Sequence, residues 1–222
     1  MEVLTVEAQT RQRRPGGIER RLLSQFGGPR GLLGRVAGWI MAGRNLPTNA
    51  WMVELLEVEP GDAVLDVGCG PGRAVEVAAT RAWRGSVAGV DVSEVMVRQA
   101  ARRNRAAVIG GLVELRQADA GRLPYPGGRF TKAGSVNSVQ FWAPPEHGFA
   151  ELHRVLAPGG RVAIVLRARN AEAGRFDRTR FGAPAERVEQ LAALLEQVGF
   201  REVRRLQRDC GGELHWALVA QR

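Results

Sequence analysis

From residue 62 onward, short runs of apolar residues alternate with segments whose apolar residues recur at helical spacing. The apolar runs predict five strands, over residues 63–67, 86–90, 113–116, 130–137 and 161–166. The segments with helical spacing predict four helices, over residues 74–81, 93–104, 149–156 and 187–198. Two further runs, 201–208 and 214–220, flank Gly211 and Gly212 and predict a terminal hairpin.

Alternation of strands and helices with short connections is typical of a parallel sheet that helices cover on both faces. We therefore predict an α/β fold of the doubly wound, Rossmann-like kind. Its seven strands are mostly parallel and end in the antiparallel hairpin. Upstream, residues 1–30 are polar and rich in glycine and proline, which predicts a mobile end. Residues 31–57 carry helical spacing in two stretches, with Thr48 or Asn49 as the cap of the second.

Composition bounds the class of protein. Of the 222 residues, 45% are hydrophobic and 25% charged, which excludes general disorder. The net charge is +9, but the arginines are dispersed along the chain, whereas a nucleic-acid-binding protein concentrates its positive charge on one face. A nucleic-acid partner is therefore not expected, although the charge does not exclude one. Cys69 and Cys210 stand far apart, so neither a zinc site nor any other metal is expected. No apolar run approaches the roughly 20 residues of a membrane span, and no signal peptide is seen, so we expect a cytoplasmic protein with no membrane partner.

The turn after the first predicted strand carries the most chemistry. Asp66 lies on the strand, and Gly68, Gly70 and Gly72 follow it in the pattern DxGxGxG. A phosphate-cradling P-loop needs GxxxxGK[ST], which is absent. A dinucleotide site needs GxGxxG, and Arg73 stands at its sixth position. A carboxylate at Asp66 repels phosphate but suits a ligand with a cationic head.

This turn resembles motif I of the class I S-adenosylmethionine-dependent methyltransferases, in particular the small-molecule, type-11-like enzymes. Further stretches agree in order and spacing over roughly residues 50–222. Asp91 stands where the family has its ribose-binding acid, Asp119 and Ala120 stand where it meets adenine, and residues 154–160 resemble the turn before its fifth strand. The resemblance implies S-adenosylmethionine as cofactor, S-adenosylhomocysteine as product, and these cofactor-binding residues: Asp66, Gly68, Gly70, Gly72, Asp91, Val92, Met96, Asp119, Ala120 and Asn137.

The resemblance also implies where the acceptor binds. Asn137 stands at the end of the fourth strand, beside the expected sulfonium, and His147 follows in the next loop as a candidate general base; we take both as catalytic. The expected acceptor pocket is aromatic and is formed by Trp39, Trp51, Phe141 and Trp142. In this family N-terminal helices often close over the site. We therefore divide the chain into residues 1–57, a flexible segment with lid helices, and residues 58–222, the methyltransferase domain.

Two positions depart from the family. Thr131 replaces an aspartate that is often structural. The fourth strand ends in Asn-Ser-Val-Gln at residues 137–140 and not in Asn/Asp-Pro-Pro-Tyr/Phe, which disfavours methylation of exocyclic base amines or glutamine amides.

We therefore expect transfer of a methyl group to an oxygen or nitrogen of a small, partly aromatic acceptor, by a monomer or homodimer. Two alternatives stay open. One is an RNA-modifying methyltransferase, suggested by the basic charge. The other is a cofactor-binding protein that transfers no methyl group and acts as a scaffold, sensor or cyclase.

Overall fold

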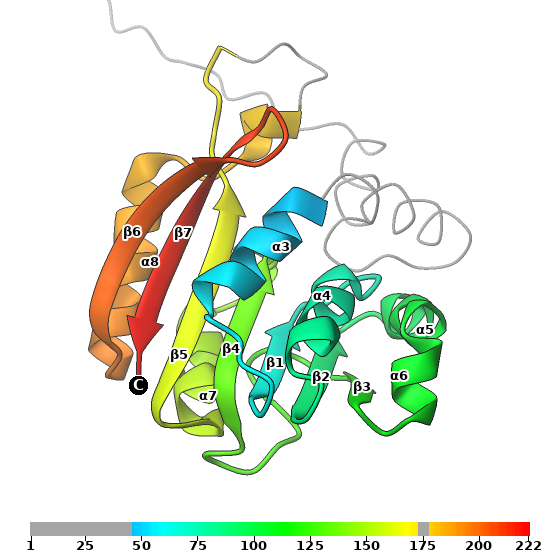
Figure 1. The fold of residues 1–222 in the computed structure, drawn as a ribbon. Helices are drawn as coiled ribbons and strands as arrows, with labels where there is room; N and C mark the ends of the chain where they lie inside the picture. Colours follow the sequence, from blue (N-terminus) through cyan, green and yellow to red (C-terminus); the bar gives the residue numbers. More distant parts are fainter. Residues whose placement is uncertain (1–45, 173–177) are drawn as a thin grey trace, which may run out of the picture.

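A single seven-stranded sheet forms the centre of the molecule (Figure 1). The structure is a computed structural model that describes residues 46–172 and 178–222. The strand order is β3-β2-β1-β4-β5-β7-β6. The strands are β1 (Ala63–Val67), β2 (Ser86–Asp91), β3 (Val113–Gln117), β4 (Phe130–Val136), β5 (Leu156–Arg167), β6 (Arg201–Asp209) and β7 (Leu214–Gln221).

Strands β1 to β5 pair in parallel, and β7 pairs antiparallel with both β5 and β6. The predicted fold class, terminal hairpin included, is confirmed. Because β2 and β4 lie on opposite sides of β1, the strand order reverses direction there, and their carboxyl ends leave a crevice.

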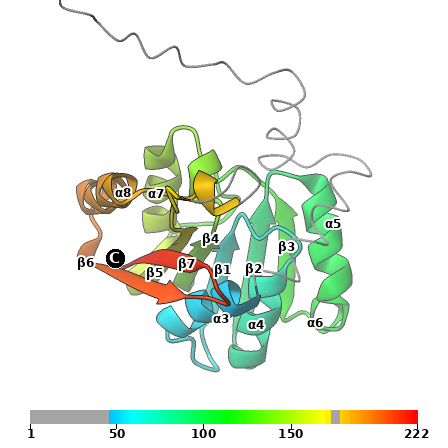
Figure 2. The same cartoon turned by 90° about the horizontal axis from the view of Figure 1, so that it is seen from above.

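Helices cover both faces of this sheet (Figure 2). On one face lie α3 (Leu46–Leu55), α4 (Arg73–Arg81) and α5 (Glu94–Arg103), which enclose one buried apolar cluster. On the other face lie α7 (Pro145–Val155) and α8 (Ala185–Val198), which enclose a second cluster. The inner strands β1, β2, β4, β5 and β7 therefore bury side chains on both faces, as their apolar runs require, whereas the edge strand β6 has no buried residue.

The predicted elements differ from the observed ones mainly at their ends. Helix α3 begins at Leu46, so Thr48 and Asn49 lie buried inside it, and the prediction that one of them caps it is wrong. The helix expected over 93–104 is followed by a separate short one, α6 (Arg105–Ile109). β5 starts at Leu156, which pairs with Phe130, so the Pro-Gly-Gly turn expected before the strand is an irregularity within it. Two short 3₁₀ helices, η1 (Val139–Phe141) and η2 (Arg178–Phe181), carry no apolar repeat that predicts them.

Helix α3 belongs to the core of the sheet. Its Trp51, Met52 and Val53 are buried in the cluster that α4 also covers, and the Met52 thioether packs against Gly134 of β4. The boundary at residues 57 and 58 stays a prediction, because the other expected lid helix lies outside the described residues. Among the described helices, none is both long enough and apolar enough to cross a membrane.

Candidate active site at the carboxyl ends of the strands

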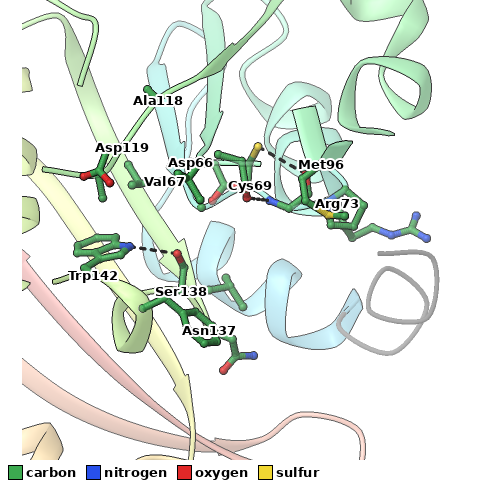
Figure 3. Close-up of a pocket in the computed structure, with 18 of the residues that line it drawn as sticks. Asp66, Val67, Cys69, Arg73, Met96, Ala118, Asp119, Asn137, Ser138 and Trp142 are labelled. Carbon is green, nitrogen blue, oxygen red and sulfur yellow. Dashed lines mark hydrogen bonds between the residues drawn. The ribbon is translucent and has the colours of Figure 1, made fainter. Parts of the chain in front are cut away.

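A cavity of about 160 Å³ opens at the carboxyl ends of β1, β2 and β4 (Figure 3). Three carboxylates line it, Asp66, Asp91 and Asp119. The aromatic rings of Phe141 and Trp142 line the same cavity from the segment after β4. The cavity therefore has an acidic side and an aromatic side, contributed by different loops of the sheet edge.

The turn between β1 and α4 is held in place by its own backbone. The N–H groups of Gly68 and Cys69 both donate to the carbonyl oxygen of Val90, at 2.8 and 2.9 Å, which ties the turn to β2. Gly68, Gly70 and Gly72 all have positive φ, at 75°, 51° and 79°, a conformation that other residues adopt only at a cost. Glycine occupies these positions because the chain must reverse sharply between strand and helix.

The glycines also leave room for neighbours. A Cβ at Gly68 would lie 1.9 Å from the Ser138 Oγ, so this turn and the segment after β4 are in contact. A Cβ at Gly72 would lie 2.7 Å from that of Ala100 on α5. At Gly70 a Cβ would meet nothing within 4 Å, and this glycine borders the cavity, so its open side faces the space for a ligand.

Asn104 is a supporting residue that the sequence does not single out as part of the site. Its side chain is buried, and its Nδ2 donates to the carbonyl oxygens of Gly72, at 3.1 Å, and Ala100, at 2.9 Å. The amide therefore links the end of α5 to the start of α4. Both carbonyl oxygens also accept from a helical N–H, of Glu76 and of Asn104, so the amide adds a second bond at each.

Asp91 ends β2, and both of its carboxylate oxygens bind backbone. Oδ2 accepts from the N–H of Gly70 at 2.9 Å, and Oδ1 accepts from the N–H of Ser93 at 2.8 Å. Burial raises the pKa of Asp91, while the two backbone N–H groups lower it. Each oxygen keeps a lone pair, so the carboxylate can still accept hydrogen bonds from a ligand in the cavity.

Asp66 is only 3% exposed, and it shares the cavity with Asp91. Burial, and then the charge of Asp91, raises the pKa of Asp66 to about 7. Burial, and then the charges of Asp66 and Asp91, raise the pKa of the Cys69 thiol well above its usual range, so this cysteine stays protonated. Two neighbouring carboxylates in a buried crevice favour a cationic ligand, which would relieve their mutual repulsion.

The turn after β3 completes the acidic side. Asp119 lines the cavity together with Ala118 and Ala120, and its Oδ1 accepts from the N–H of Gly121 at 2.7 Å. Val92, directly after β2, and Met96 of α5 also line it; Met96 is buried, while half of Val92 is exposed. Apolar side chains therefore flank the Asp119 carboxylate, which suits a flat ring with polar substituents.

The segment after β4 forms the other side. Trp142 Nε1 donates to the Ser138 Oγ at 3.1 Å, which fixes the hydroxyl and the indole against each other (Figure 3). Asn137 has a φ of 51°, and its Oδ1 accepts from the backbone N–H of Arg167 at 2.7 Å, so its side chain links the ends of β4 and β5. Figure 3 shows this side chain pointing away from Asp66.

Of the predicted site residues that the structure describes, three do not line the cavity. Gly72 supports the turn from the N-cap position of α4, and Trp51 of α3 is buried in the core. His147 lies exposed in the first turn of α7, next to Gly121. Trp39 lies outside the described residues.

The cavity also contains residues that the sequence reasoning did not assign to a ligand. Asn49 reaches it from α3 and Ser138 from the segment after β4. Cys69 and Arg73 line it too. Ser138 directly follows a predicted site residue, which is the one available signal; nothing in the helical pattern of α3 singles out Asn49.

Comparison with known proteins identifies the family. A family model described as a methyltransferase domain matches residues 65–164, the stretch that holds the glycine turn and all three cavity carboxylates. An uncharacterized methyltransferase of Bacillus subtilis is 33% identical over 168 residues, which is 76% of this chain and 87% of that protein. The chain belongs to the class I S-adenosylmethionine-dependent methyltransferases.

Solved structures agree on the fold of this methyltransferase. An S-adenosylmethionine-dependent methyltransferase from Aquifex aeolicus superposes with a TM-score of 0.64 at 22% identity, covering 80% of this chain and 92% of that one. The [4+2]-cyclase SpnF also superposes with a TM-score of 0.64 at 22% identity, covering 80% of each chain. At this level of identity the likeness is one of fold.

The residues around the cavity fit the family's cofactor. The acidic crevice at Asp66 and Asp91 suits the ammonium and sulfonium charges of S-adenosylmethionine. The open space at Gly70 lets the cofactor approach the backbone of the turn closely. Asp91 retains lone pairs for the two ribose hydroxyls. The described residues include no group of three or more His, Cys, Asp or Glu side chains that could hold a metal ion.

The raised pKa of Asp66 predicts how the free energy of unfolding depends on pH. Its folded pKa of about 7 lies above the unfolded value of 3.8, so between these values the folded methyltransferase binds the extra proton. Stability is therefore highest below the lower value and falls as pH rises to about 7. At pH 8 we expect Asp66→Asn to raise the free energy of unfolding, by up to about 4 kcal/mol.

Urea unfolding of both proteins between pH 5 and pH 8 measures this effect. Glu94→Gln is the matched control, because Glu94 is exposed and pairs with Arg98 on the surface of α5. A wild-type stability that does not fall relative to Asp66→Asn over this range would contradict the assignment. Binding of S-adenosylmethionine should show the opposite trend and tighten with pH, because the ionised carboxylate attracts its positive charges.

Proposed function

We propose that this methyltransferase moves a methyl group from S-adenosylmethionine to an oxygen or nitrogen of a small, partly aromatic acceptor. The observation that carries the proposal is the two-sided cavity, with carboxylates on one side and Trp142, Phe141 and Ser138 on the other. The first side suits the cationic cofactor and the second a flat, partly apolar molecule.

When bound, the cofactor supplies a methyl group already activated by a positively charged sulfur. The chain's own task is alignment: Asp91 and Asp119 would hold the adenosyl part, Asp66 the charged end, and Trp142 the acceptor ring. Holding the two reactants in line is worth roughly 7–11 kcal/mol of the barrier. Asn137 would act on the acceptor side from the end of β4, where it lines the cavity.

A general base is not required in this proposal. His147, the candidate from the sequence, is exposed on α7 and does not line the cavity. The titratable side chains that do line it, among the described residues, are Asp66, Cys69, Arg73, Asp91 and Asp119, which lie on the cofactor side. An acceptor whose reacting atom is already ionised or carries a free lone pair reacts without proton removal.

The same lack of a base favours a second candidate, a protein that binds the cofactor without transferring its methyl group. The fold likeness to a cyclase is compatible with it but shows only the fold. An RNA acceptor is the third candidate, and it would need a salt-dependent shift of labelled RNA.

Two measurements separate these candidates. Isothermal titration with S-adenosylmethionine tests binding, and release of S-adenosylhomocysteine over a panel of phenols, amines and hydroxy acids tests transfer. Binding with acceptor-dependent release supports the proposal. Tight binding with no release over the whole panel favours the non-transferring protein, and absence of binding contradicts the assigned site.

A further inference from the structure

A second cavity, of about 170 Å³, lies next to the first. It is enclosed by the carboxyl ends of β4 and β5, by η1, and by the N-terminal part of α8 with the loop that precedes it. Asn137 lines both cavities. A molecule in the second cavity would therefore reach the cofactor site past the end of β4.

The wall of this cavity is largely apolar, with Val139, Leu166 and Leu191 among its residues. Of the ten described residues that form it, two carry a charge, and both are arginines. Arg167 is neutralised, because its Nε donates to the Glu213 carboxylate at 2.9 Å. An apolar pocket with a few converging polar groups is the usual form of a small-molecule site.

Arg187 is the cation that is not neutralised. It is half-buried on α8, and its Nη1 donates to the neutral amide oxygen of Gln190 at 3.1 Å. Within residues 46–172 and 178–222 it forms no ion pair with a carboxylate. Glu186, its neighbour in the first turn of α8, is exposed and does not line the cavity. A guanidinium in this position offers planar, paired donors to an anion.

Asn137 adds a donor with a fixed direction. Because its Oδ1 accepts from the Arg167 N–H, its amide cannot turn over without losing that bond. Its Nδ2 is buried and has no acceptor among the described residues. A buried donor without an acceptor is destabilising, so a ligand oxygen at this place would be stabilising.

We propose that the second cavity binds a carboxylate group of the methyl acceptor, held by the Arg187 guanidinium and the Asn137 Nδ2. The proposal rests on the proposed function and names its substrate class as small carboxylic acids. The carboxylate is the anchor, and the atom that receives the methyl group lies past Asn137, beside Ser138 and Trp142.

The charge of the site favours a carboxylate over a phosphate. One unpaired guanidinium matches a planar monoanion, whereas a phosphate dianion needs further cations. The start of α8 adds only a partial positive charge: its N-cap residue is Pro184, which makes no side-chain capping bond.

Benzoate and benzamide are the matched probes, because they have the same shape and differ in charge. Their binding to the full chain, saturated with S-adenosylhomocysteine, is measured by ligand-observed NMR. We expect benzoate to bind at least about tenfold more tightly than benzamide, and Arg187→Met to remove that difference. Arg98→Met, which removes one positive charge from an exposed site on α5, should leave both affinities unchanged.

The affinity for S-adenosylhomocysteine is measured separately, because it reports whether the protein is folded and its cofactor site is intact. If the wild-type protein binds no S-adenosylhomocysteine, the proposed function fails, and with it this inference. If S-adenosylhomocysteine binds normally to wild type and to Arg187→Met, three results would each overturn the inference alone. These are equal binding of benzoate and benzamide, benzoate binding that Arg187→Met does not weaken, and inorganic phosphate that binds more tightly than benzoate.

Discussion

Replacing Asp91 by alanine is expected to weaken binding of S-adenosylmethionine by about a hundredfold or more. In its proposed role the carboxylate accepts hydrogen bonds from both ribose hydroxyls, and each bond to a charged group contributes roughly 1.5–3 kcal/mol. The substitution also removes the acceptors of the Gly70 and Ser93 N–H groups, which hold the glycine turn against β2. Isothermal titration measures the affinity directly.

Glu94→Ala provides the control for this experiment. Glu94 lies three residues away in the first turn of α5, carries the same charge, and is exposed in its pair with Arg98. It should bind S-adenosylmethionine as the wild type does. Asp91→Ala with unchanged affinity and an unchanged melting temperature would remove the ribose role from this carboxylate. A loss of affinity in both variants would point to overall charge instead.

Replacing Gly68 by alanine is expected to destabilise the protein and to weaken cofactor binding together. The residue has a φ of +75°, and the new Cβ would lie 1.9 Å from the Ser138 Oγ, so the turn and the segment after β4 must move apart. Overpacking of this kind typically costs roughly 1–3 kcal/mol, in addition to the strain of the positive φ. Thermal unfolding and titration with S-adenosylmethionine measure the two effects.

Gly111→Ala separates strain from crowding. Gly111 has the same φ of +75°, but a Cβ there would meet nothing within 4 Å, and the residue is far from the cavity. It should show the backbone cost alone and normal cofactor binding. Equal destabilisation by the two substitutions, with cofactor binding retained in both, would show that the contact between Gly68 and Ser138 has no role in the site.

The chain's local patterns predict the cofactor side well. Asp66, Asp91 and Asp119 each stand at or just after the end of an apolar run, and parallel strands bring their carboxyl ends to one edge of a sheet. The glycines of the turn can also be recognised in the sequence, because glycine is the residue that adopts a positive φ most readily. Their roles in binding stay predictions, although their meeting in one cavity follows from the fold.

The acceptor side depends on contacts that no local pattern encodes. Trp51 has the spacing of a lid residue but is buried, because α3 packs on β4 and β5. His147 follows the fourth strand closely, yet it lies outside the cavity because α7 begins at Pro145, two residues earlier than the histidine. Helix starts of this kind are decided by packing as much as by propensity.

The sequence by itself determined the order of strands and helices, the sharp turn at residues 68–72 and the three acidic strand ends, since each depends on residues close together in the chain. Only the tertiary structure brought Ser138 against Gly68, opened the wall of the cavity to Asn49 of α3, and set Arg187 of α8 beside a second cavity that Asn137 shares. These groups are separated by tens of residues. Their meeting follows from how two helical layers pack on the sheet, which no single segment specifies.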